Sequence, residues 1–81
     1  MWTEIKEPDK KVPYNYVEAE TPIGEFVISW KGWKEIPSYD IELNDKWLGS
    51  EYDLESAKNL AMNHLIETTN KLNSFIKENF T

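Results

Sequence analysis

The chain has 81 residues, no cysteine and a net charge of −6, and all nine of its basic residues are lysine. This length predicts one domain, and a chain without cysteine has neither disulfides nor thiolate sites. Because arginine is the residue best suited to phosphate and guanine contacts, an acidic chain without it is not expected to bind nucleic acid directly or an acidic membrane surface.

Residues 1–13 form an N-terminal segment rich in charged residues. It lacks the apolar stretch of a signal peptide, and no run in the chain approaches the roughly 18 apolar residues of a membrane span. We therefore expect a cytoplasmic protein.

Residues 14–49 predict an antiparallel β-meander. Segments 14–20, 25–30 and 38–43 alternate apolar and polar side chains, and residues 46–49 favour a short fourth strand. Turn signals separate them at Gly24 and at Asn44-Asp45. The alternation places these apolar side chains on one face: Val17, Ala19, Phe26, Ile28, Trp30, Tyr39, Ile41 and Leu43.

Residues 53–80 predict one long helix, with Asp53 as its N-cap. Apolar residues recur there at spacings of three and four, which is the period of an amphipathic helix. Thr68 and Thr69 are poor helix formers, so a break at this point is the alternative to a continuous helix. The predicted fold is α+β, with a three- or four-stranded antiparallel sheet and one long C-terminal helix on one face.

Such a helix would be longer than the sheet that it covers. About 26 helical residues span roughly 39 Å, whereas strands of about six residues span roughly 20 Å. The C-terminal half would therefore overhang the sheet with Ile66 and with four apolar residues nearer its end, Leu72, Phe75, Ile76 and Phe80. We expect the N-terminal segment to cover them through Trp2, Ile5, Val12 and Tyr14; the alternative is a second copy of the chain, which would make these four residues a dimer seam.

The other face of the sheet is predicted to be strongly acidic. It carries Glu18, Glu20, Glu25, Asp40 and Glu42, with no lysine on it within the strands. Four further acidic residues would extend the field at one edge: Asp45, Glu51, Asp53 and Glu55. Alternate residues along a strand are about 6.6 Å apart and neighbouring strands about 4.8 Å apart, which is close to the spacing of backbone phosphates. Such a face would attract a basic nucleic-acid groove of another protein. The alternative is an ordinary solvated sheet face.

The loop 31–37 is basic and aromatic in an otherwise acidic chain. An exposed Trp33 would be a typical binding hot spot; the alternative is that it closes one end of the core. The single His64 lies on the apolar stripe of the helix, and one histidine without cysteine gives no metal-ligand set. We expect no metal, no cofactor and no enzymatic activity.

Taken together, the strand ending in TPIGEFVISW, the aromatic loop and the helix start YDLESAKNLAMNHL resemble a class of short phage and prophage proteins. The resemblance covers roughly residues 14–66, and its motifs are structural. Several proteins of this class are anti-defence factors, including anti-CRISPR proteins. The resemblance implies a phage-encoded inhibitor acting in the host bacterial cytoplasm, and it supplies no functional residues. Combined with the charge pattern, it predicts that the acidic face occupies a basic groove of a defence complex, with Trp33 as a neighbouring anchor. The alternative function is a homodimeric structural or assembly module joined through the C-terminal helix.

Overall fold

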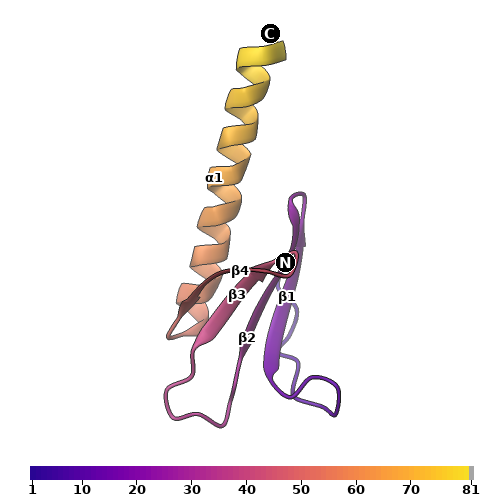
Figure 1. Ribbon diagram of the computed structural model, residues 1–81, viewed down its shortest axis with the longest axis vertical. Coiled ribbons are helices and arrows are strands. Elements are labelled where there is room, and N and C mark those ends of the chain that lie inside the picture. Colours follow the sequence, from indigo (N-terminus) through magenta and orange to yellow (C-terminus); the bar gives the residue numbers. More distant parts are fainter. Residues whose placement is uncertain (81) are drawn as a thin grey trace.

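The computed structural model describes residues 1–80 and has the predicted α+β fold, a four-stranded antiparallel sheet with one helix packed against it (Figure 1). The strands follow one another across the sheet in chain order, as a meander. The elements are β1 (Asn15–Thr21), β2 (Gly24–Trp30), β3 (Tyr39–Leu43), β4 (Lys46–Glu51) and α1 (Leu54–Phe80).

The β1–β2 and β3–β4 turns lie side by side and are joined by Asn44. The backbone of Asn44 and Asp45 has positive φ angles of 50° and 67°, as tight hairpin turns require. The Asn44 side chain accepts a hydrogen bond from the Glu25 amide (3.0 Å) and donates one to the Ile23 carbonyl (3.3 Å). Gly24 has a φ of 133°, and a Cβ there would overlap the Asn44 side chain, so only glycine suits this position.

The core lies between the sheet and the first half of α1. Its buried side chains are Val17, Ala19, Phe26, Ile28, Trp30, Ile41, Ala57 and Ala61. The two alanines are the buried residues of α1, and their small size lets the helix approach the sheet closely. Trp30 closes one end of the core by packing on Tyr39, with ring centroids 4.9 Å apart.

The helix is continuous from Leu54 to Phe80. Asp53 caps it as predicted, because its carboxylate accepts hydrogen bonds from the Ser56 amide (2.7 Å) and the Ser56 hydroxyl (2.9 Å). The break considered at Thr68-Thr69 does not occur. The Thr69 hydroxyl donates to the Leu65 carbonyl at 2.8 Å, so its polar group is satisfied within the helix.

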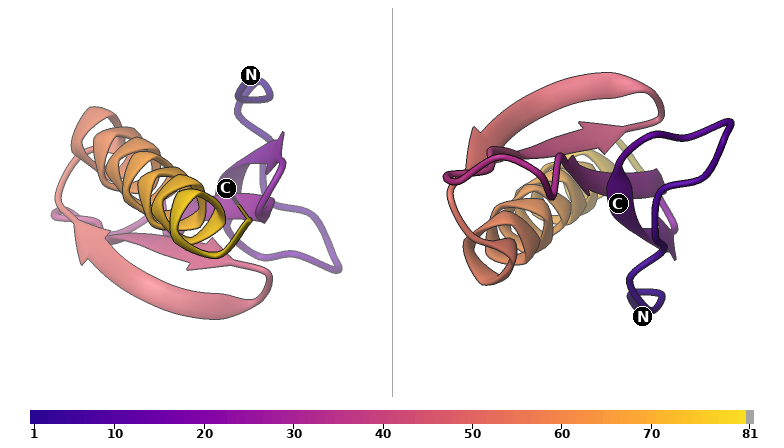
Figure 2. Two further views of the ribbon diagram at one scale, coloured as in Figure 1. Left: turned by 90° about the horizontal axis from the view of Figure 1, so that it is seen from above. Right: turned by 90° about the horizontal axis from the view of Figure 1, so that it is seen from below.

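The N-terminal segment runs antiparallel along the outer edge of β1 (Figure 2). The Thr3 amide donates to the Glu18 carbonyl (2.9 Å), and Lys6 and Tyr16 exchange two backbone hydrogen bonds. Trp2 packs against the core and helps to line an apolar depression that reaches Leu65 of α1. The segment therefore covers the middle of the helix and goes no further.

The last part of α1, residues 66–80, projects beyond the sheet and is called the overhang below (Figure 1). The protein consequently measures 52 × 23 × 19 Å. The expected cover by the N-terminal segment is wrong for the overhang, since Ile5 is itself exposed and Val12 and Tyr14 lie beside the acidic face instead. The exposed fractions of the four seam residues are 51% for Leu72, 56% for Phe75, 50% for Ile76 and 74% for Phe80.

Candidate functional site

The strand register places the predicted acidic residues on the sheet face that α1 does not cover. Glu20 lies directly opposite Glu25 across β1 and β2, and Glu18 and Glu42 flank Val27 from the two neighbouring strands. All four alternate with buried residues of the same strands. This set, together with Asp40, is called the acidic face below.

Four of the carboxylates gather at the end of the sheet where the two turns meet. The pKa of Glu25 is raised by partial desolvation and by its acidic neighbours Glu18, Glu20 and Asp45, with a further contribution from a side-chain hydrogen bond with Glu18. A carboxyl group whose pKa is raised in this way sits in a field of like charge. These four residues are called the acidic cluster. Asn44 of the β3–β4 turn holds it together, because its side chain makes both of its hydrogen bonds to the β1–β2 turn.

A lysine from outside the strands partly balances the acidic face. The Lys6 ammonium contacts the Glu18 carboxylate at 2.8 Å and lies 5.5 Å from the centroid of the Tyr16 ring. The hydrogen bond to Glu18 raises the pKa of Lys6. The alternation of the strands gave no sign of this contact, because Lys6 reaches the face from the N-terminal segment. Among residues 1–80, no ion pair joins a lysine to Glu20, Glu25 or Glu42.

Asp40 is on the predicted face but apart from the acidic cluster. It pairs with Ser29 in the register, toward the other end of the sheet, and lines a shallow depression with Lys31 and Lys34 of the β2–β3 loop. The two lysines make this end of the face less negative than the end that carries the turns. The structure therefore brings three of the five predicted acidic residues together in the acidic cluster, places Glu42 beside it, and leaves Asp40 in a mixed-charge setting.

Two tryptophans are exposed, Trp33 and Trp47, and the sequence predicted only Trp33 as an anchor. Trp33 is 65% exposed, so it does not close the core, but the β2–β3 loop puts it at the end of the sheet away from the acidic cluster. Trp33 is therefore not beside the acidic cluster, although the sequence predicted it as a neighbouring anchor. Trp47 is 64% exposed and lies opposite Glu42, on the acidic face itself. The two-residue turn at Asn44-Asp45 gives this pairing directly, and the register shift falls beyond it, where Ile41 pairs with Gly49.

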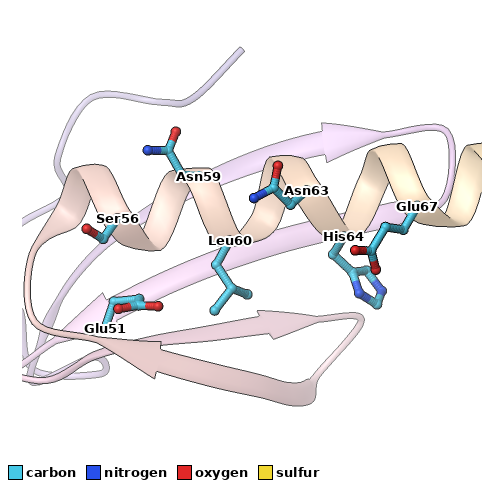
Figure 3. A pocket seen from close by; sticks show the side chains of 7 residues that line it. All are labelled: Glu51, Ser56, Asn59, Leu60, Asn63, His64 and Glu67. Atoms are coloured by element: carbon cyan, nitrogen blue, oxygen red, sulfur yellow. The ribbon is translucent and has the colours of Figure 1, made fainter.

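A polar groove runs between β4 and α1 (Figure 3). Glu51 lies beside the first turn of the helix, whereas His64 and Glu67 lie about two turns further along. The His64 ring meets the ring of Phe26 edge-on at 6.3 Å and is half-buried. Within residues 1–80, no three of the His, Asp and Glu side chains are grouped so as to hold a metal ion.

None of the described residues, 1–80, belongs to a helix with the length and apolar character needed to cross a membrane.

Comparison of the chain with protein-family models, with curated proteins and with solved structures finds no match.

Proposed function

We propose that this protein is a non-enzymatic inhibitor that binds another protein and occupies its basic, nucleic-acid-binding groove with the acidic face. The observation that carries this proposal is the strand register, which gathers four glutamates of the acidic face on the uncovered side of the sheet. Among residues 1–80, only Lys6 forms an ion pair with one of them, so these like charges repel one another. A basic partner would relieve that repulsion on binding. This gain in binding free energy requires a partner whose positive charges lie opposite the carboxylates of the acidic cluster.

The acidic cluster is preorganised for such a partner. Its carboxylates project from paired strands, and the Asn44 side chain fixes the two turns that carry Glu20, Glu25 and Asp45. Ordering these groups on binding therefore costs little entropy. The strand spacings of about 6.6 and 4.8 Å resemble the distances between phosphates in a nucleic-acid backbone, so a groove built for phosphates would accept these carboxylates.

The proposed partner is a bacterial defence complex that handles nucleic acid, and the proposed source is a phage. This part of the proposal rests on the resemblance of residues 14–66 to small phage anti-defence proteins. The chain's charge of −6 supports a protein partner over nucleic acid, because a phosphate backbone would be repelled. We propose Trp47, which is exposed beside Glu42, as the aromatic contact of the acidic face; Trp33 would contribute where the partner's surface extends along the whole sheet.

The experiment is a pull-down from bacterial lysate with tagged protein, eluted in steps of increasing salt. Each eluted protein is then assayed for DNA or RNA binding with and without the inhibitor. We expect a nucleic-acid-binding protein that elutes as salt rises, because screening weakens exposed charge pairs, and that loses its nucleic acid when the inhibitor is added.

Two double variants with the same change of net charge sharpen the test. Glu20→Lys with Glu42→Lys reverses charge on the acidic face, whereas Glu7→Lys with Glu35→Lys reverses it in exposed segments outside the strands. The first variant should lose capture and inhibition and the second should keep both. Equal inhibition by the two variants would show that the acidic face is not the contact surface.

A further inference from the structure

We propose that the overhang of one copy pairs with the overhang of a second copy as an antiparallel two-helix seam. In this seam Leu72 of each copy packs opposite Phe75 of the other. The inference is independent of the acidic face, because the overhang lies beyond the sheet. The resulting dimer carries two acidic faces, one from each copy.

Three apolar side chains of the overhang, Leu72, Phe75 and Ile76, form one stripe, and the half-exposed Ile66 lies to one side of it. Leu65, Leu72 and Asn79 recur every seven residues, Thr68 and Phe75 do the same, and Ile76 flanks them, which is the a, d and e pattern of a paired helix. Leu72, Phe75 and Ile76 are each at least half exposed. The rings of Phe75 and Phe80 touch edge-on at 6.2 Å, so the apolar surface is continuous to the end of the helix.

The geometry of the rest of the molecule fits an antiparallel partner. When Leu72 lies opposite Phe75 of the other copy, Phe80 lies opposite Glu67 of that copy. The two helices therefore overlap only along their overhangs. It stops just short of Leu65, which already lines the apolar depression beside Trp2. Neither sheet has to move, because each lies beyond the C-terminal end of the other copy's helix.

Charge favours the same orientation. In an antiparallel pair with this register, the edge position of Lys71 lies beside that of Glu78 in the other copy, and the symmetry creates this contact twice. In a parallel pair Lys71 would lie beside Ile76 instead, with no complementary charge. A parallel pair would also bring the two acidic sheets to the same level, whereas the antiparallel pair separates them by the overhang, which is about 22 Å long.

The size of the seam predicts weak association. Four half-exposed large side chains and their neighbours in each copy bury roughly 1,000 Å² in total, at the low end for a specific interface. We therefore expect a dissociation constant on the order of 1–100 µM, with monomers at low concentration and dimers at high concentration.

Sedimentation equilibrium over a wide concentration range tests the association. The wild-type chain should shift from monomer to dimer. Leu72→Glu with Phe75→Glu should remain monomeric, while Asn70→Glu with Ser74→Glu, on the opposite side of the overhang, should dimerise like the wild type. Unchanged helix content by circular dichroism checks that all variants are folded. A wild-type chain that stays monomeric at several hundred µM, or a double variant at Leu72 and Phe75 that still dimerises, would overturn the proposal.

Cysteine cross-linking tests the orientation, since the chain has no cysteine of its own. Thr68 and Asn79 are level with each other across an antiparallel seam, so Thr68→Cys mixed with Asn79→Cys should form a disulfide-linked heterodimer on mild oxidation. Asn79→Cys alone should not cross-link, because its two copies lie at opposite ends of the seam. Rapid cross-linking of Asn79→Cys alone would indicate a parallel pair and refute the proposed register.

Discussion

The Asn44 side chain is the most informative single place to perturb the fold, because it links the two turns that carry the acidic cluster. Asn44→Gly keeps the left-handed backbone of this position and removes both side-chain hydrogen bonds. Each such bond contributes about 0.5–1.5 kcal/mol. The free energy of unfolding should therefore fall by about 1–3 kcal/mol, which lowers Tm by about 4–8 °C for each kcal/mol in a domain of this size.

A second substitution at the same position separates the hydrogen bonds from the backbone. Asn44→Ala also loses both bonds. Unlike glycine, alanine keeps a Cβ in the left-handed region, and it lacks the polar side chain that lets asparagine adopt this conformation, at a further cost of about 1–2 kcal/mol. Asn44→Ala should thus be clearly less stable than Asn44→Gly. The control is Asp45→Gly, which changes the next left-handed residue and leaves the linking side chain in place.

Urea unfolding followed by circular dichroism and tryptophan fluorescence measures all three variants. The midpoints should fall in the order wild type, Asn44→Gly, Asn44→Ala, with Asp45→Gly at or above the wild type and the slopes unchanged. If Asn44→Gly unfolds at the wild-type midpoint, the two hydrogen bonds do not stabilise the fold and the link between the turns has no energetic weight.

Two further predictions concern pH. Partial desolvation and neighbouring carboxylates raise the pKa of Glu25. Its contribution to stability is therefore present below its ordinary pKa and lost as the pH rises through the raised value. Glu25→Gln should raise Tm at pH 7, and the difference should vanish below about pH 4; Glu35→Gln is the control. Hydrogen bonds from Ser56 lower the pKa of Asp53, so the contribution of Asp53 to stability is present at neutral pH and lost in acid. Asp53→Ala should lower Tm by about 5 °C at pH 7 and by less below pH 4. Asp53→Asn should retain most of the capping.

The fold could be predicted from the sequence because its signals are local. Period-two alternation gave the strands, a turn residue marked each hairpin, and Asp53 marked the start of the helix. The error at the overhang was a tertiary one. Ile5, Val12 and Tyr14 are apolar enough to cover the overhang, but the backbone of the segment pairs with the edge of β1 instead. Satisfying backbone hydrogen bonds at an open sheet edge outweighed covering the helix.

The acidic face was predicted less completely, for the same reason. Strand alternation correctly assigned Glu18, Glu20, Glu25 and Glu42 to one face. It could not show that Lys6 would reach that face, since the contact joins residues far apart in the chain. The register counted from the two-residue turn at Asn44-Asp45 does place Trp47 opposite Glu42, because the register shift falls beyond that pair.

The two proposed contact surfaces share one end of the molecule, yet salt should separate them. Thr21, at the turn end of β1, helps to line the same apolar depression as Met62 and Leu65, so the overhang leaves the sheet beside the acidic cluster. Binding to a basic groove depends on exposed charges and should weaken as salt shortens the Debye length to about 8 Å and below. The helix seam depends on Leu72, Phe75 and Ile76, and its exposed Lys71–Glu78 pairs contribute little. Raising salt should therefore release the partner protein while the dimer persists.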